Sequence, residues 1–364
     1  ATVSRRYSGA CGARWKPPST ACTLLTPDTA IARRTELTTP RWPQDVITTV
    51  DFELPPLAEG HVRVAVLAAP INPSDVLTLT GEYGILPPLP AVGGNEGVGR
   101  VVEAAGDVTH LAVGTVVLLP VGCGTWTTHL DLPAKHLVAL PSGVDPVQLS
   151  MLTVNPPTAL LMLTEFVDLQ PGDWVIQNAA NSAVGGYLVQ LAKLRGIHTI
   201  NVVRRASAID AVKASGAEHV VVDAEDLPKR VHAVTGGAPV KLAIDCIGGV
   251  ATENLARCLV EGGTLVNYGA MSGERCMISP RYFVFRDITL RGFWLSQWFK
   301  KATPAQRTAV FGEIAKLIAE GKLQARVQAT YDLDHIKQAV QAAASGARDG
   351  KIVLEPNGPS RAAL

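Results

Sequence analysis

The chain has 364 residues, 47% of them hydrophobic, and its 33 Lys and Arg against 32 Asp and Glu leave a formal net charge of only +1. This length and content fit a well-packed protein of two domains, and the balanced charge excludes the strong basic field that favours nucleic-acid binding. The apolar stretches are interrupted by Gly or Pro and fall short of the roughly 18 residues that cross a membrane, so we expect no membrane span.

The first 28 residues differ in composition from the rest. Their basic residues are Arg5, Arg6, Arg14 and Lys16, they include several Ser and Thr, and no acidic residue precedes Asp28. This composition is typical of a mitochondrial transit peptide, and a disordered cytosolic tail is the alternative. We interpret residues 1–28 as a transit segment outside the fold.

The chain from about residue 45 to 155 predicts a compact, mostly β domain. Short runs rich in β-branched residues are separated by Pro and Gly turns. The strands that we expect are Val46–Phe52, Val62–Leu67, Val98–Val102 and Thr115–Leu119.

From Asp173 the pattern changes to strands that alternate with helices. The expected strands are Trp174–Gln177, Thr199–Val203, His219–Val222, Leu242–Asp245, Thr264–Asn267 and Ile288–Gly292. A series of this kind predicts a doubly wound parallel sheet.

A further helix is expected after this sheet. Thr303-Pro304-Ala305-Gln306 is a capping box with Pro at the first helical position, and Gly321 is a stop signal. The last segment, from Tyr331 to Leu354, has a mixed pattern that is compatible with a return to the first domain.

The stretch "QNAANSAVGG", residues 177–186, lies between the first expected strand of the sheet and a helix. A phosphate-binding loop there needs small residues at three positions spaced by three, and Ala179, Ser182 and Gly185 are all small. Asn181 and Ser182 can also bind phosphate or cap the helix. On its own the loop is equally compatible with an ordinary turn between strand and helix.

The end of the next strand indicates which dinucleotide is bound. NAD-binding chains place an acidic residue there for the ribose 2′-hydroxyl, whereas this chain has Arg204-Arg205. Two guanidinium groups favour a 2′-phosphate, so the pattern predicts NADPH; a solvated basic strand end is the alternative.

The order of a β-rich domain before a doubly wound sheet resembles the medium-chain dehydrogenase/reductase superfamily. Its zinc-dependent members carry Gly-His-Glu and a cysteine ligand in the first domain. This chain has Gly94-Asn95-Glu96, and its first domain holds only Cys123 after the transit segment. Because Asn is a poor zinc ligand, we expect no metal and a reaction that needs only a proton donor.

Five stretches resemble the mitochondrial trans-2-enoyl-thioester reductases of type II fatty acid synthesis, a zinc-free branch of that superfamily. They are "APINPSDVLTLTGEYGILPPLPAVGGNEGVG", "VNPPTA", "PGDWVIQNAANSAVGG", "INVVRR" and "RGFWLSQW", and together they span residues 69–299. The resemblance implies an α/β protein with a GroES-like β-rich catalytic domain, residues 29–156 and 299–364, and a doubly wound NADP-binding Rossmann domain, residues 157–298. It also implies a homodimer.

The family's catalytic tyrosine falls on Tyr83. A phenol stays protonated near neutral pH and can donate to the enolate-like oxygen that forms when an enoyl thioester is reduced. Without the resemblance, Tyr83 on its Pro- and Gly-rich loop is more simply a turn residue that packs its ring.

The resemblance further implies the residues that contact NADPH. They are Asn155; Asn181, Ser182, Ala183 and Val184 at the pyrophosphate; Arg204, Arg205 and Ala206 at the 2′-phosphate; Tyr268, Gly269, Ala270 and Met271; Phe293, Trp294, Leu295 and Ser296; and Lys351. For Phe293, Trp294 and Leu295, packing in the core or in a dimer is an equal alternative. Two positions depart from the family: Ala183 replaces a Gly, and Ala206 replaces the distal Arg of Arg-Asp-Arg, so that either Arg205 substitutes or the preference for NADPH is weaker.

We therefore expect an NADPH-dependent reductase of trans-2-enoyl thioesters, carried by coenzyme A or acyl carrier protein, in the mitochondrial matrix. A zinc-free quinone or alkenal oxidoreductase is the nearest alternative. A non-catalytic NADPH-binding protein with the same fold is the other.

Overall fold

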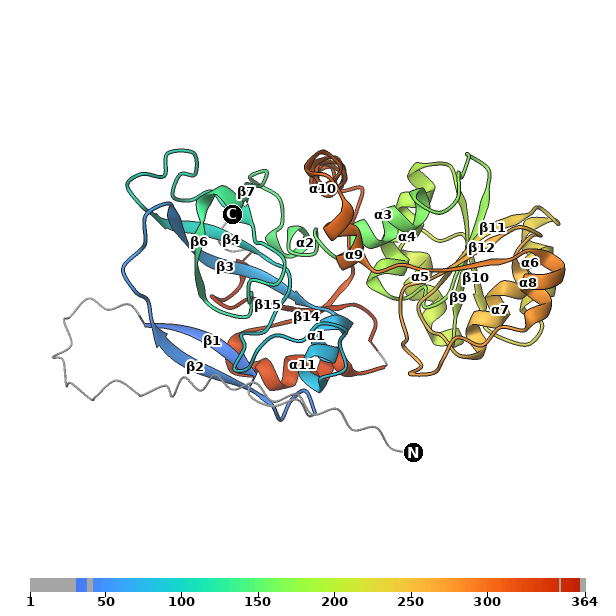
Figure 1. Cartoon of the computed structure of the whole chain (residues 1–364), viewed down its shortest axis with the longest axis horizontal. Coiled ribbons are helices and arrows are strands. Elements are labelled where there is room, and N and C mark those ends of the chain that lie inside the picture. Colours follow the sequence, from blue (N-terminus) through green and yellow to red (C-terminus); the bar gives the residue numbers. More distant parts are fainter. Residues whose placement is uncertain (1–30, 38–41, 347, 361–364) are drawn as a thin grey trace, which may run out of the picture.

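The computed structural model describes residues 31–37, 42–346 and 348–360. Figure 1 shows two units side by side, with α3 (Asn155–Thr164), α9 (Leu295–Lys301) and α10 (Pro304–Ala319) where they meet. The proposed transit segment, residues 1–28, lies outside the described residues. No helix within the described ranges is long and apolar enough to cross a membrane.

The first unit is built around a seven-stranded sheet. Its path is β14-β15-β3-β4-β5-β7, with β6 paired to β3. The strands are β3 (His61–Ile71), β4 (Val98–Ala104), β5 (Val116–Leu118), β6 (His129–Pro133), β7 (Val138–Ala139), β14 (Val327–Tyr331) and β15 (Lys351–Leu354). A separate antiparallel pair, β1 (Ile31–Leu37) and β2 (Ile47–Glu53), and the helices α1 (Pro73–Thr80), α2 (Pro146–Leu149) and α11 (Ile336–Ala344) complete it.

The sequence of β3 explains its central place in this sheet. Val62, Val64 and Val66 alternate with less buried residues, and the strand is continuously buried from there to Ile71. Such a strand needs cover on both faces in its second half. Ile352 of β15 pairs with Ile71 of β3, so β15 belongs to the sheet of the first unit.

The second unit is a six-stranded parallel sheet of order β10-β9-β8-β11-β12-β13. Its strands are β8 (Trp174–Gln177), β9 (His198–Val203), β10 (His219–Val222), β11 (Val240–Asp245), β12 (Thr264–Asn267) and β13 (Thr289–Gly292). Its helices are α4 (Ala183–Leu194), α5 (Ile209–Ala214), α6 (Leu227–Thr235), α7 (Val250–Cys258) and α8 (Pro280–Arg286). All six predicted strands are present, and the order reverses between β8 and β11, which is the Rossmann topology.

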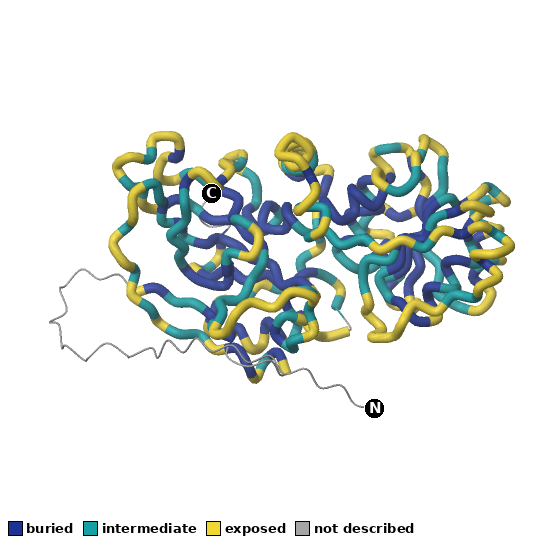
Figure 2. Tube along the Cα trace, in the orientation of Figure 1, coloured by how far each residue is buried: buried dark blue, intermediate teal, exposed yellow. Residues whose placement is uncertain are grey.

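One apolar cluster is shared by the two units. It includes Leu67 and Leu118 from the first sheet, Val175 and Leu188 from the Rossmann unit, and Ile314 from α10. Figure 2 shows buried segments in the interior of each unit and between them. The predicted capping box begins α10, because Gln306 N donates to Thr303 Oγ1 and Thr303 N donates to Gln306 Oε1.

Two glutamines hold the segment that leads from α10 back to the first sheet. The side-chain amide of Gln190, on α4, both donates to and accepts from the backbone of Gln324, at 2.9 Å each. Gln148, on α2, makes the same pair of bonds with Ala325, at 3.1 and 2.8 Å. Consecutive residues are thus bound by the two different units.

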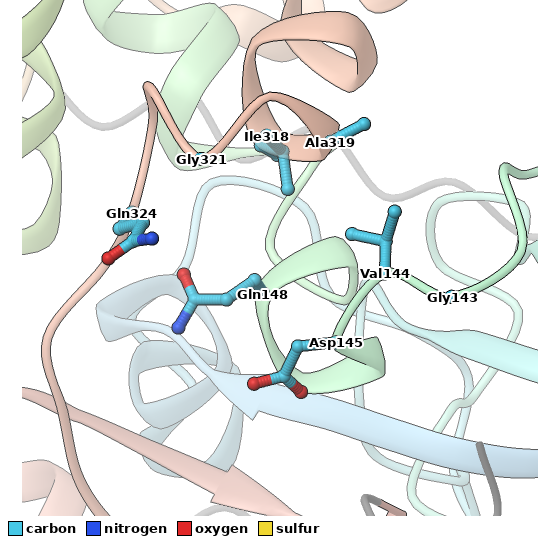
Figure 3. A pocket seen from close by; sticks show the side chains of 8 residues that line it. All are labelled: Gly143, Val144, Asp145, Gln148, Ile318, Ala319, Gly321 and Gln324. Carbon is cyan, nitrogen blue, oxygen red and sulfur yellow. The ribbon is translucent and has the colours of Figure 1, made fainter.

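A cavity of about 320 Å³ opens beside this segment, between α2 and the end of α10 (Figure 3). Its lining includes Asp145, Gln148, Ile318 and Gln324, and none of the predicted catalytic or cofactor residues. The cavity therefore does not coincide with the candidate site.

Replacement of Gln190 by Ala should destabilise the junction between the units. Two hydrogen bonds to the backbone of Gln324 are lost, and we expect the free energy of unfolding to fall by roughly 1–2 kcal/mol. Urea denaturation measures this. Gln341→Ala, on the exposed face of α11, is the control and should change stability little; equal stability of the two variants would contradict a role for Gln190 in joining the units.

Candidate active site

The predicted phosphate loop connects β8 to α4. Ser182 is the N-cap of α4, and its Oγ accepts from the backbone N–H of Gly185 at 3.1 Å. A Cβ on Gly185 would lie 2.6 Å from the carbonyl oxygen of Ala180, so only glycine fits there. Ala179 adopts a φ of +47°, a conformation that favours glycine and costs about 1 kcal/mol otherwise. The loop thus keeps the backbone of a glycine-rich turn although two of its three small residues are not Gly.

A buried aspartate organises the carboxyl edge of the Rossmann sheet. Asp245, at the end of β11, accepts from Asn178 Nδ2 at 2.6 Å and from Asn267 Nδ2 at 3.0 Å. The two asparagines follow β8 and end β12, respectively, so one carboxylate ties three strand ends together. Thr252 and the backbone of Ile247 add further donors. Sequence reasoning missed Asp245, for which the only signal is an acidic residue at the end of an apolar strand.

The segment after β12 lies against the phosphate loop. Tyr268 is partly buried, and burial raises the pKa of its hydroxyl, which also hydrogen bonds with Ser182. A Cβ on Gly269 would lie 2.8 Å from the carbonyl oxygen of Cys246, which requires glycine there. Ala270 follows, and Met271 is exposed. The structure therefore places Ser182 and the segment Tyr268–Met271 at the same edge of the sheet.

Both arginines after β9 are exposed, and the next residue, Ala206, begins a short 3₁₀ turn. Arg205 Nη2 donates to the carbonyl oxygen of Gly346 in the first unit, at 3.1 Å. Arg205 thus bridges the two units in this structure, and the exposed Arg204 precedes it directly after β9.

Tyr83 and Trp294 meet across the two units. Tyr83 follows α1, and Trp294 is the N-cap of α9, directly after β13 and Phe293. Trp294 Nε1 donates to the Tyr83 hydroxyl oxygen at 3.2 Å, and the two rings meet edge to face with centroids 6.2 Å apart. The sequence relates neither residue to the other, and the structure places them in contact.

The residues on either side of Trp294 have different surroundings. Phe293 packs edge to face on Phe166, with ring centroids 5.9 Å apart, so the core-packing alternative describes its side chain. Leu295 and Ser296 form the first turn of α9 and are partly buried.

Asn155 and Lys351 belong to a buried polar cluster centred on Asn72. Asn72 Oδ1 accepts from Lys351 Nζ and from Asn155 Nδ2, the latter at 2.9 Å. Asn72 Nδ2 donates to Glu96 Oε1 at 2.7 Å, and Glu96 Oε2 accepts from the hydroxyl of Thr153 at 2.9 Å. Sequence reasoning missed Asn72 and Thr153, because the partners of Asn72 are distant in sequence.

Burial shifts the titration of this cluster. It raises the pKa of Glu96 to about 7 and that of Asp75 to about 6, and it lowers the pKa of Lys351 to about 8. Asn95, which stands at the usual position of a zinc-binding histidine, donates from Nδ2 to Asp75 Oδ1 at 2.7 Å. Within the described ranges no three His, Cys, Asp or Glu side chains are grouped so that they could hold a metal ion.

Comparison with known proteins agrees with this architecture. Residues 58–142 match the alcohol dehydrogenase GroES-like domain, and residues 183–316 match the zinc-binding dehydrogenase model. The GroES-like sheet and the Rossmann sheet together define a medium-chain dehydrogenase/reductase. Within this class, the chain belongs to the mitochondrial enoyl-[acyl-carrier-protein] reductase family.

The similarity extends over nearly the whole chain. The human enoyl-[acyl-carrier-protein] reductase, mitochondrial, is 40% identical over 86% of this chain and 85% of its own length. The solved complex of Etr1p with NADP and crotonyl-CoA is 30% identical and has a TM-score of 0.81 over 90% of this chain and all of its own. The Etr1p/Etr2p heterodimer of mitochondrial 2-enoyl thioester reductase from Candida tropicalis has a TM-score of 0.80 at 30% identity, with the same coverage.

Replacement of Glu96 by Gln should change how stability depends on pH. Because the pKa of Glu96 is raised on folding, its favourable contribution is complete below about pH 4.5 and is lost as the pH rises to about 7. The Gln variant lacks this loss, so its melting temperature should fall less steeply across that range, although Asp75 still titrates there. Calorimetry from pH 4.5 to 7.5 measures the slopes. The exposed control Glu59→Gln should follow the wild type; parallel curves for Glu96→Gln and wild type would refute the interpretation.

Proposed function

We propose that this protein reduces trans-2-enoyl thioesters to saturated acyl thioesters with NADPH, as part of mitochondrial type II fatty acid synthesis. The observation that carries the proposal is the contact between Tyr83 and Trp294. It brings the hydroxyl of the predicted catalytic residue to the carboxyl edge of the Rossmann sheet, where ligands of such sheets bind. The family and the solved complex of Etr1p with NADP and crotonyl-CoA support the same chemistry.

The chain's own residues fit NADPH. The N-terminus of α4, where Asn181, Ser182, Ala183 and Val184 lie, would direct backbone N–H groups to a pyrophosphate. The N–H of Ser182 already donates to the carbonyl oxygen of Ala179 at 2.9 Å. Arg204, and Arg205 if it releases Gly346, would hold the 2′-phosphate. We assign the remaining contacts to Tyr268–Met271, to Trp294–Ser296, to Asn155 and to Lys351.

Tyr83 is the proposed catalytic residue. NADPH, when bound, supplies a hydride to the β-carbon of the enoyl thioester. Trp294 donates to the Tyr83 oxygen, so the hydroxyl proton of Tyr83 is not used in this bond. Tyr83 can then donate that proton toward the thioester oxygen, or through water toward the α-carbon. Trp294 orients the hydroxyl and excludes water from one side of it.

We further propose that the protein works in the mitochondrial matrix on thioesters of coenzyme A or acyl carrier protein. The relatives are named mitochondrial, and the composition of residues 1–28 is that of a transit segment. The relatives' names refer to acyl carrier protein, whereas the solved complex of Etr1p is one with crotonyl-CoA, a coenzyme A ester.

A homodimer is the proposed assembly, formed through the free edge of the Rossmann sheet. β13 is the last strand on that edge and pairs with β12 alone in the described sheet. Beside it, α8 exposes Phe285 at 78% and Val284 at 70% of their surfaces. An unpaired strand edge next to exposed apolar side chains is a favourable surface for a second copy of the chain.

Replacement of Tyr83 by Phe should lower kcat for crotonyl-CoA by roughly 100-fold, because the proton donor is lost. The affinity for NADPH should stay the same. NADPH oxidation and fluorescence titration measure the two quantities, and Tyr331→Phe is a control that removes a hydroxyl elsewhere. If the wild-type protein reduces quinones but no enoyl thioester, the quinone reductase alternative holds; if it binds NADPH and reduces neither, it is a binding protein.

Replacement of Phe285 by Asp should convert the dimer to a monomer, because a charge would be buried in the proposed interface. Light scattering after size-exclusion chromatography measures the mass. Val113→Asp places the same charge at a position that is 64% exposed on the first unit and should leave the dimer intact. A wild-type monomer, or a dimeric Phe285→Asp variant, would show that this edge is not the interface.

A further inference from the structure

The polar cluster around Asn72 joins three distant parts of the chain. Asn72 precedes α1, Asn155 begins α3 and Lys351 begins β15, and all three side chains are at least 95% buried. Such a site costs desolvation free energy, so every group in it needs a partner. The arrangement of the partners shows what the cluster does.

Asn72 lies between a buried amino group and a buried carboxylate. Its oxygen accepts from Lys351 Nζ, and its nitrogen donates to Glu96 Oε1. A carboxylate can only accept, so Glu96 fixes which end of the carboxamide faces Lys351. The carboxamide of Asn72 therefore lies between the two opposite charges and hydrogen bonds with both. A direct ion pair would draw Lys351 toward Glu96.

The second oxygen of Glu96 is also occupied. Thr153 donates to Glu96 Oε2 from its hydroxyl at 2.9 Å and from its backbone N–H at 3.2 Å. Thr153 lies two residues before Asn155, so Glu96 fixes both the approach to α3 and the carboxamide of Asn72. Burial raises the pKa of Tyr187 on α4, and the negative charge of Glu96 raises it further, so the cluster lies near the helix that begins at the phosphate loop.

Asn72 is also the N-cap of α1, the helix that ends three residues before Tyr83. Asn72 N donates to Asp75 Oδ2 at 2.7 Å, which fixes the first turn of α1. At the other end, the backbone N–H of Tyr83 donates to the carbonyl oxygen of Leu77 at 3.1 Å. A helix of eight residues thus connects Asn72 to the catalytic hydroxyl.

We propose that Asn72 is a positioning residue for this reaction: its carboxamide holds Lys351 and Asn155 on one oxygen, keeps Lys351 apart from Glu96, and presents both groups to the cofactor in register with Tyr83. This inference rests on the proposed function, since it uses the cofactor roles of Asn155 and Lys351. The residue acts through its neighbours and does not itself touch the reacting atoms.

Two substitutions test the role of Asn72. Asn72→Ala removes the spacer, so Lys351 can pair with Glu96, and we expect the Kd for NADPH to rise about tenfold and kcat for crotonyl-CoA to fall. Asn72→Asp has nearly the same shape. When protonated, it donates to Glu96 as the amide does, and when ionised it repels Glu96 and Asp75 and attracts Lys351. Because Lys351, whose pKa is about 8, titrates in the same range, each Kd is compared with that of the wild type at the same pH. The ratio should be near one at pH 6 and clearly above one at pH 8.5.

Fluorescence titration with NADPH at both pH values gives the binding readout, and NADPH oxidation with crotonyl-CoA gives kcat. The matched control is Asn357→Ala, which removes another bridging carboxamide, bonded to the carbonyl oxygens of Val66 and Thr128 away from the site. It should lower the melting temperature and leave the Kd unchanged.

Each outcome decides between a positioning role and a purely structural one. If both Asn72 variants bind NADPH as the wild type does and differ only in melting temperature, the proposal is overturned. If Asn72→Ala does not fold, the pH dependence of Asn72→Asp decides alone. A wild-type protein that binds NADPH without reducing crotonyl-CoA would refute the proposed function, while the Kd values would still decide the role of Asn72; a wild type that does not bind NADPH would refute both.

Discussion

The buried carboxylate of Asp245 is the interaction on which the cofactor half of the molecule depends. The parallel strands of a Rossmann sheet end at the same edge, and ligands bind between the loops that follow them. These loops keep fixed positions only if hydrogen bonds connect one loop to the next. Asp245 accepts from the residues at the ends of the two neighbouring strands, Asn178 and Asn267. The phosphate loop and the Tyr268 segment are therefore held in one fixed relation, which is the condition for binding a rigid dinucleotide.

The catalytic half is organised on the same principle around Glu96. This carboxylate is also fully buried and also joins segments that are far apart in sequence, through Asn72 and Thr153. The two carboxylates lie in different units, and the contact of Tyr83 with Trp294 connects the parts that they organise.

Sequence patterns within a few residues predicted much of this structure, whereas contacts between residues far apart in the chain could not be predicted from them. The six Rossmann strands and the cap at Thr303 follow from periodicity and turn residues within a few positions. The phosphate loop was recognised from its small residues, and Ala179 with its positive φ shows why composition alone left it ambiguous. By contrast, Asn72 and Lys351 are 279 residues apart, so no sequence window relates them.

The hydrogen bonds of Gln190 with Gln324 and of Gln148 with Ala325 limit how the length of the chain can change between α10 and the first sheet. Loops on a protein surface usually accept insertions and deletions. The segment after α10 differs, because Gln324 must face α4 while its neighbour Ala325 faces α2. If one residue were removed or added there, the backbone N–H and C=O groups of this segment would no longer line up with both glutamine side chains. In descendants of this chain, and in engineered versions of it, the length of this connection should therefore be far more constant than its sequence.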